Sequence, residues 1–324
     1  MVDILSAGRR PYKELSLQQL RSFCEVCRVG GYAAAARELL LTSPAVWEQL
    51  KALEKHFGLV LLERHGNGVR PTLHGERLLE LARPLLAGLE STFDVLHQRD
   101  GVLPDRLTVV SNLRVLVHEI SDALALFRTR YPGERLQISY TGSPEIEALV
   151  LEQEADVTLT LEPGAGEPTS PAIAFEPAAE LDYLLVTPLH HPLQRAKNIR
   201  LEAIVRHPLV LGIPEAYSRH RVHEVLHRHD LLRQMNIAVE TSSDEYTLSC
   251  VRAGLGVGVT VGNGDGLLYS RLSVRSLKNW FGTARVGFMW RRGAVVAPLQ
   301  RELADILRAS ISHRGNGRKR FPRS

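Results

Sequence analysis

The hydrophobic pattern of the chain changes near residue 104, and this change limits the fold more than any other feature. Before it, apolar residues recur every three or four positions, which is typical of amphipathic helices. After it, short apolar runs alternate with helical segments, which predicts an α/β fold with parallel strands. A chain of 324 residues is long enough for two or more domains with separate cores. We therefore expect a helical N-terminal domain followed by an α/β domain.

Residues 1–73 predict a small domain of three helices and a hairpin. Gly30-Gly31 separates the first two helices, and Thr42-Ser43-Pro44 supplies a hydroxyl cap and a first-turn proline for a third over residues 43–57. Asn67-Gly68 lies between two short extended runs, which is typical of a β-hairpin turn. Such short connections make helices cross sharply, so we expect a winged helix-turn-helix.

The third predicted helix is the candidate DNA-reading element. With Val46, Leu50 and Leu53 turned inward, its opposite face carries hydroxyls and lysines, which suit phosphates and base edges in a major groove. Arginines flank the hairpin, where they are placed to reach the DNA backbone. The candidate DNA-binding residues are Ser43, Pro44, Trp47, Glu48, Lys51, Lys55, Arg64 and Arg70. The alternative is a merely solvated amphipathic helix.

A long helix is predicted from Thr72, a plausible cap, to about Gln98, and residues 74–103 are expected to form a linker helix and hinge. Pro84 interrupts it and predicts a kink. The helix carries an apolar stripe that is too long for a small domain to cover, so we expect a dimer with a partner helix. The stripe consists of Leu78, Leu81, Leu85, Leu89, Phe93 and Leu96.

Residues 104–310 predict two α/β lobes, the second beginning near Leu181, with a last strand and helix that return to the first lobe. Residues 311–324 hold five Lys and Arg and no acid, and predict a disordered basic tail. Without this tail, 35 basic residues face 36 acidic ones, so the net charge of +4 does not by itself indicate DNA binding.

Polar residues follow the predicted strands of both lobes and precede helices. Hydroxyls and free N–H groups at these positions suit a carboxylate or another small anion. The candidate effector-binding residues are Ser111, Asn112, Thr141, Gly142, Ser143, Thr241, Ser242 and Ser243. Ordinary N-capping is the alternative for each of them. Asp244 and Glu245 would oppose an anion, so the charge of the effector stays open.

Other motifs compete with this interpretation. His223, Glu224 and His227 match HExxH, the helical zinc site of hydrolases, but chance explains much of the match in a chain with 13 histidines. Zinc hydrolysis is therefore a remote alternative. Cys24 and Cys27 form a CxxC inside a predicted helix, where core packing is favoured over redox chemistry. The sequence has no G-x-S-x-G elbow and no P-loop, so we expect neither an enzyme nor a cofactor.

The chain has no uncharged apolar run of about 18 residues and no signal-peptide core, so we expect no membrane segment. Three cysteines in a chain of this length suit a reducing compartment. We therefore expect a cytoplasmic protein.

Several ordered blocks resemble the LysR-type transcriptional regulators. They cover about residues 15–310 and include SPAV at 43–46, LKALE at 50–54, LLER at 61–64, VRPTLHG at 69–75, FRTRYPGERLQISYTGS at 127–143, EADVTLTL at 154–161, HHPL at 190–193 and VRAGLGVGV at 251–259. The resemblance implies a winged helix-turn-helix, a linker helix and a two-lobed effector domain like periplasmic solute-binding proteins. It also implies promoter DNA and a small-molecule effector as partners, assembly as a homodimer or homotetramer, and RNA polymerase as a further candidate partner.

The chain departs from the family on the DNA-reading helix. Ser43 and Trp47 stand where the family usually has glutamine and then serine, and Glu48 adds a negative charge. Either Trp47 packs sideways and Glu48 pairs with Lys51 or Lys55, or base readout is altered. A ligand-binding sensor with a degenerate DNA-reading helix is therefore the alternative function.

Overall fold

The computed structural model describes residues 15–111, 117–141, 143–163, 169–214, 216–264 and 266–314. The chain divides into two compact units. The first runs to His97 and includes Arg291–Val296, and the second holds Gln98–Trp290 and the residues from Ala297 onward. Among the described helices, none is long and apolar enough to cross a lipid bilayer.

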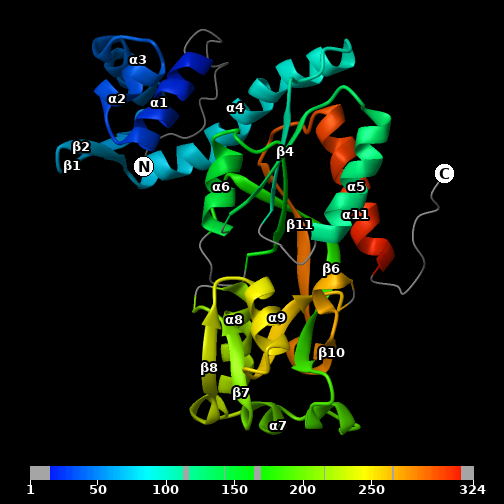
Figure 1. Ribbon diagram of the computed structural model, residues 1–324. Coiled ribbons are helices and arrows are strands. Elements are labelled where there is room, and N and C mark those ends of the chain that lie inside the picture. Colours follow the sequence, from blue (N-terminus) through cyan, green and yellow to red (C-terminus); the bar gives the residue numbers. More distant parts are fainter. Residues whose placement is uncertain are drawn as a thin grey trace, which may run out of the picture. The chain divides into compact units, whose positions relative to one another are not determined.

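The first unit begins with a head of three helices, α1 (Leu17–Val29), α2 (Tyr32–Glu38) and α3 (Ser43–Phe57), drawn in blue in Figure 1. Thr42 caps α3 by accepting a hydrogen bond from the N–H of Ala45 at 3.3 Å, and Pro44 lies in the first turn. Helix α3 has the bounds expected from its sequence. The head core contains Phe23, Val46, Leu50 and Leu53, all of which are buried.

A two-stranded hairpin, the wing, follows α3. Its strands β1 (Leu62–His65) and β2 (Gly68–Pro71) pair antiparallel, with His65 opposite Gly68. The turn residues are therefore Gly66 and Asn67, so the expected Asn67-Gly68 turn is wrong by one position. Gly66 has a φ of +56°, which glycine adopts at no steric cost. Gly68 instead packs on the head, where an added Cβ would lie 2.3 Å from the carbonyl oxygen of Gly30.

The long helix α4 (Leu73–Arg99) continues through Pro84 as one helix. Thr72 caps it by accepting a hydrogen bond from the N–H of Gly75 at 3.1 Å, and its own hydroxyl donates to the carbonyl of Val60 at 2.8 Å. Along the predicted stripe, Leu78 packs against the head core and Leu89 is half-buried, whereas four of the six side chains are exposed. The exposed members are Leu81, Leu85, Phe93 and Leu96.

The segment Arg291–Val296, here called the clamp loop, packs on α4 within the first unit. The N–H of Val295 donates to the hydroxyl of the buried Ser91 at 2.9 Å, and Arg291 pairs with Glu90 at 2.8 Å. Gly293 approaches α4 so closely that an added Cβ would lie 2.4 Å from the carbonyl oxygen of Pro84. The sequence gives no local signal for this attachment, because it joins residues about 200 positions apart.

The second unit is an α/β domain that contains the two expected lobes. The first lobe opens with β3 (Leu107–Ser111), α5 (Val117–Arg130), β4 (Leu136–Tyr140), α6 (Ser143–Leu151) and β5 (Val157–Leu161). The chain continues with β6 (Ile173–Pro188), α7 (Leu201–Val205), β7 (Pro208–Gly212), α8 (Tyr217–Arg228), β8 (Asn236–Thr241), α9 (Asp244–Arg252), β9 (Val257–Gly262) and β10 (Leu272–Ser276). It closes with α10 (Lys278–Phe281), β11 (Thr283–Arg291) and α11 (Pro298–Arg314).

One nine-stranded sheet runs through both lobes in the order β4-β3-β5-β11-β6-β9-β7-β8, with β10 paired to β6. Strand β11 pairs antiparallel with β5, and α11 packs beside α5, so the end of the domain returns to the first lobe as expected (Figure 1). Strand β6 begins at Ile173, well before the expected start near Leu181. Helix α11 extends to Arg314, into the predicted tail, and residues 315–324 lie outside the described residues.

Candidate DNA interface and effector site

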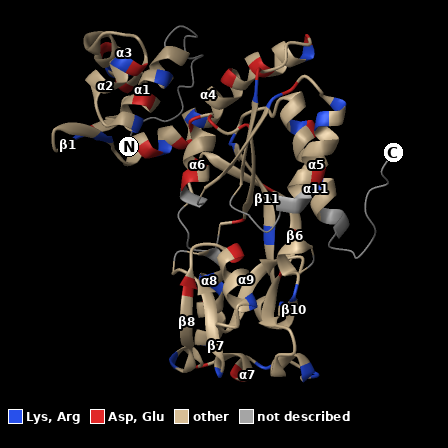
Figure 2. Ribbon diagram, viewed as in Figure 1, with Lys and Arg blue, Asp and Glu red and all other residues tan. Residues whose placement is uncertain are grey.

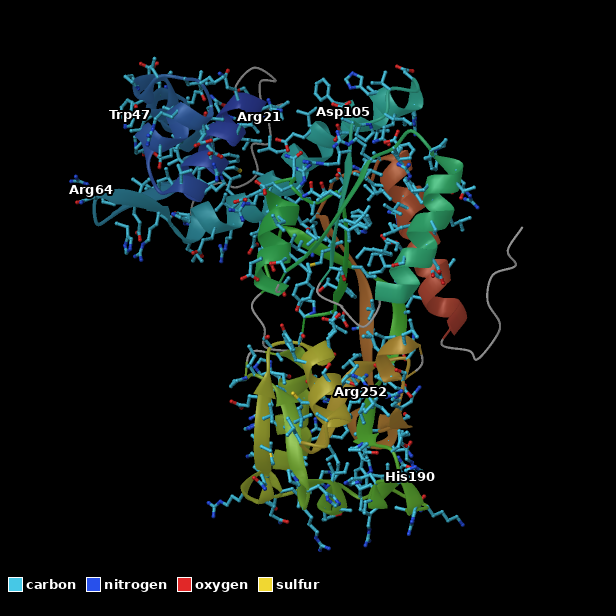
Figure 3. The ribbon with its side chains drawn as sticks, viewed as in Figure 1. Arg21, Trp47, Arg64, Asp105, His190 and Arg252 are labelled. Atoms are coloured by element: carbon cyan, nitrogen blue, oxygen red, sulfur yellow. The ribbon has the colours of Figure 1, made fainter. Side chains whose placement is uncertain are left out.

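The exposed face of α3 carries the residues expected to meet DNA. Val46, Leu50 and Leu53 anchor the helix in the head core, which leaves the opposite face open to solvent. The exposed residues on that face are Ser43, Pro44, Trp47, Glu48, Lys51 and Lys55. Figure 3 places Trp47 and the wing residue Arg64 on the same side of the head. The head therefore presents one surface that combines the helix with the wing.

Trp47 and Lys51 lie together on this face. Trp47 is 49% exposed, and the ammonium of Lys51 lies 5.8 Å from the ring centroid, within the range of a cation–π contact. Lys51 also forms an ion pair with Glu54, with 2.7 Å between Nζ and Oε2. The hydrogen bond to Glu54 raises the pKa of Lys51.

Glu54 connects α3 to the wing. Its Oε1 accepts hydrogen bonds from the N–H groups of Leu61 at 2.9 Å and Leu62 at 3.4 Å. Burial raises the pKa of this carboxyl, but the hydrogen bonds from Lys51 and the two backbone N–H groups outweigh burial and hold the pKa below its usual value. Glu54 belongs to the LKALE block but was not among the predicted site residues. The i, i+3 spacing from Lys51 was the one signal that pointed to it.

One alternative was that Glu48 pairs with Lys51 or Lys55. Lys51 instead pairs with Glu54. Glu48 is exposed and makes no ion pair with any residue that the structure describes. Glu54 is favoured because its side chain is only 12% exposed and its other oxygen is already fixed by the backbone. No described cation therefore neutralises the negative charge of Glu48 on the exposed face of α3.

The two wing arginines differ in their surroundings. Arg70 pairs with Glu63 directly across the hairpin, with 2.7 Å between Nε and Oε1. Arg64 is exposed and forms no ion pair within the described part of the chain. Figure 2 shows both signs of charge on the helices of the head. Arg64 is thus better placed than Arg70 to contact a phosphate.

In the first lobe, two of the candidate effector residues meet at the carboxyl ends of neighbouring strands. Ser111 ends β3 and is buried, and Thr141 follows β4. The N–H of Thr141 donates to the carbonyl of Ser111 at 3.3 Å, which brings the two residues side by side. Asn112, Gly142 and the side chain of Ser143 lie outside the described residues.

In the second lobe, two of the three candidate hydroxyls form hydrogen bonds with other residues of the same lobe. Thr241 is buried, and its hydroxyl bonds to the carbonyl of Leu211 at 3.3 Å and to the hydroxyl of Thr247 at 2.6 Å. Ser243 is the N-cap of α9, as the capping alternative expects. The expectation that Thr241 faces an effector is therefore not supported by its hydrogen bonds, whereas Ser242 is exposed.

Asp244 opens α9 next to these residues. Burial of its carboxyl is the main cause of a pKa raised to about 7, which the N–H of Val261 partly opposes and the neighbouring Glu245 increases. At neutral pH, Asp244 therefore carries less negative charge than an ordinary aspartate. Its opposition to an anion is weaker than its sequence position suggests.

In the described residues, the competing motifs are engaged in ion pairs or packed against the head core. Arg221 donates to Glu224 at 2.7 Å and Arg228 also binds this carboxylate, so both hydrogen bonds lower the pKa of Glu224. Throughout the described ranges, no group of three His, Cys, Asp or Glu could hold a metal ion. Cys24 and Cys27 pack against the head core, and burial is the main cause of thiol pKa values of about 11 and about 12. Such thiols carry little thiolate at neutral pH.

The comparisons with known proteins agree with this architecture. The LysR substrate binding domain matches residues 100–312, and the bacterial regulatory helix-turn-helix of the lysR family matches residues 17–76. The chain is 30% identical to the probable HTH-type transcriptional regulator LrrA of Synechococcus elongatus, over 76% of this chain and 80% of LrrA. It is also 30% identical to the HTH-type transcriptional regulator CbbR of Sinorhizobium medicae, over 76% of each chain.

Solved structures show the same fold. H2O2-bound OxyR from Corynebacterium glutamicum aligns with a TM-score of 0.57 at 24% identity, covering 94% of this chain and 95% of OxyR. CbnR in complex with its target DNA aligns with a TM-score of 0.52 at 21% identity, covering 92% of this chain and all of CbnR. Since one family model alone spans more than half of the sequence, the chain belongs to the LysR family of DNA-binding transcriptional regulators, with an effector-binding domain after the helix-turn-helix.

Proposed function

We propose that this regulator binds double-stranded promoter DNA with α3 in a major groove and the wing beside the phosphate backbone. The observation that carries this proposal is the shared surface of Trp47 on α3 and Arg64 on the wing. Lys55 and Arg64 are exposed and form no ion pair with any described residue, so both are available to phosphates. Ser43, Pro44, Trp47 and Glu48 are exposed on the same face of α3 and would meet base edges.

The regulator would act as a homodimer through α4, or as a tetramer built from such dimers. Leu81, Leu85, Phe93 and Leu96 are each 58–68% exposed on this helix. Four large apolar side chains on one helix are a typical seam for a second helix. A dimer would place two heads on one DNA duplex and so double the number of base contacts.

A small-molecule effector would bind the α/β domain at the carboxyl ends of β3 and β4. Ser111 and Thr141 lie side by side there. Asn112, Gly142 and Ser143 stay candidates because they are next to these two residues in the sequence. Ser242 and Ser243 are the second-lobe candidates. The effector shifts the DNA-binding equilibrium only by its difference in affinity for the two conformations, typically about 1–3 kcal/mol.

Fluorescence anisotropy with duplexes from the DNA that flanks the gene tests the DNA-binding proposal, with a scrambled duplex as the reference. We expect specific binding that weakens with salt, and Arg64→Ala should reduce the salt slope by about 0.9. Arg70→Ala is the matched control, because Arg70 is already paired with Glu63, and it should change the slope less. Binding of a ligand with no affinity for any duplex would instead favour a sensor with a degenerate DNA-reading helix.

We further infer a non-enzymatic regulator that needs no cofactor and acts in the cytoplasm, with RNA polymerase as a further partner. The ion pairs of Glu224 with Arg221 and Arg228 support this view over zinc hydrolysis. Stoichiometric zinc in the purified protein, together with a hydrolytic activity that Glu224→Gln abolishes, would contradict it.

A further inference from the structure

Among the described residues, Glu54 joins three residues of the head, Lys51, Leu61 and Leu62, although it does not lie on the exposed face of α3. Its side chain is only 12% exposed, and its two oxygens face in different directions, one toward the wing and one toward Lys51. We propose that Glu54 is a positioning residue for DNA binding, which fixes the wing to α3 and holds Lys51 back from the phosphates. This inference rests on the proposed DNA face.

Glu54 attaches the wing to α3. The Oε1 atom of Glu54 accepts the N–H of Leu61 at 2.9 Å and that of Leu62 at 3.4 Å, where β1 begins. On the other strand, the N–H of Val69 donates to the carbonyl of Gly30 at 2.9 Å. The hairpin is thus tied to the head on both strands, and Arg64 lies on the strand that Glu54 holds. Glu54 therefore sets the distance between Arg64 and the residues of α3.

The carboxylate of Glu54 also holds the charged end of Lys51. Its ammonium lies 2.7 Å from Glu54 and 5.8 Å from the Trp47 ring centroid. A lysine that already has a carboxylate partner must give up that partner before it can bind a phosphate, so it displaces fewer counterions from DNA than a free lysine. Lys55, one turn further along α3, has no such partner among the described residues. Glu54 therefore suppresses the contribution that Lys51 makes to DNA binding.

Two substitutions separate the two roles. Glu54→Gln keeps an oxygen that can accept the N–H of Leu61 but removes the charge that holds Lys51. Glu54→Ala removes both. Duplexes from the DNA flanking the gene and scrambled duplexes are titrated with the full-length protein by anisotropy at several KCl concentrations, and thermal melting checks that each variant is folded.

We expect Glu54→Gln to make the salt slope steeper by about 0.9, the value of one added phosphate contact. It should strengthen binding to both duplexes, because a freed Lys51 does not distinguish sequences. In the otherwise unchanged protein, Lys51→Ala should leave the salt slope nearly the same. In the Glu54→Gln variant, it should remove the added slope and the added affinity. Glu54→Ala should lower the ratio of specific to scrambled affinity by about tenfold, because a displaced wing no longer fixes the orientation of α3 on the base edges.

Glu63→Gln is the matched control. It releases Arg70 in the same way, since Glu63 pairs with Arg70 at 2.7 Å, but the wing stays attached through Glu54. It should therefore steepen the slope and preserve the specificity ratio of the unchanged protein.

The outcomes distinguish this inference from the proposed function. If the unchanged protein binds no duplex, the proposed DNA face is wrong. If it binds DNA, and Lys51→Ala alone lowers the slope by about 0.9 while Glu54→Gln has no effect, then Lys51 already contacts a phosphate and its suppression by Glu54 is refuted. A folded Glu54→Ala protein that keeps its full specificity ratio refutes the role of Glu54 in placing the wing.

Discussion

Replacing Gly293 by alanine tests whether the clamp loop is held to α4 by close backbone contact. Gly293 has a φ of +85°, and an added Cβ would lie 2.4 Å from the carbonyl oxygen of Pro84. Gly101 provides a matched control, because its φ is +84° and nothing lies within 4 Å of its added Cβ. Both substitutions carry the cost of a left-handed alanine, about 1–2 kcal/mol, so their difference isolates the steric contact.

The size of that difference follows from what the clamp loop loses when it moves away from Pro84. The hydrogen bond from the N–H of Val295 to Ser91 is worth about 0.5–1.5 kcal/mol net. The ion pair of Arg291 with Glu90 adds about 0–1 kcal/mol, because it is only partly buried. We therefore expect Gly293→Ala to weaken the attachment of the loop by about 1–2 kcal/mol more than Gly101→Ala does.

Hydrogen exchange of the Val295 amide measures this attachment directly. One to two kcal/mol corresponds to exchange that is about 5–30 times faster in Gly293→Ala than in Gly101→Ala. Amides of the head, such as that of Leu50, should exchange equally in both variants, because the head core lies outside the contact. Equal exchange of the Val295 amide in the two variants would show that the close approach to Pro84 does not hold the loop.

Three further predictions concern other parts of the molecule. Leu85→Asp should dissociate the proposed dimer in sedimentation experiments without lowering the melting temperature of the monomer, since Leu85 is 63% exposed, and an unchanged dimer would exclude this seam. Asp244→Asn should remove a pH dependence of stability. The folded pKa of about 7 lies above the unfolded value of about 3.9, so between these values only the folded state holds the proton. The free energy of unfolding therefore falls as pH rises from about 4 to 7, by at most about 4 kcal/mol. Urea unfolding at pH 5 and pH 8 checks this slope, and a slope that Asp244→Asn leaves unchanged would assign it to other groups. Leu40→Asn should stabilise the head by about 0.5–1 kcal/mol, because Leu40 is 92% exposed with a φ of +54° and asparagine tolerates this conformation better. A lower melting temperature for Leu40→Asn would contradict this.

Features that depend on residues close in sequence were predictable. The hydroxyl of Thr42, the proline at position 44 and the spacing of Val46, Leu50 and Leu53 define α3, and each acts within about one turn of helix. The alternation of strands and helices likewise predicted the two lobes and the return of β11 and α11 to the first lobe.

The candidate site was predictable only in part. The exposed positions on α3 follow from helical periodicity once the inward face is known. Helical periodicity does not predict which carboxylate pairs with Lys51, because Glu48 and Glu54 both lie three residues from it along the helix. Glu54 is selected because the start of the wing folds back onto it and fixes its carboxylate. Thr241 similarly loses its free hydroxyl to Leu211 and Thr247.

The sequence by itself determined the helices, the strands and the family, since periodicity, caps and ordered motifs are properties of short segments. The tertiary structure alone decided which groups meet across long separations. It placed the wing turn at Gly66-Asn67 by packing Gly68 against Gly30, and it brought the clamp loop onto α4 at Pro84 and Ser91. These contacts depend on how closely two backbones approach in the folded chain, which no local pattern of residues specifies.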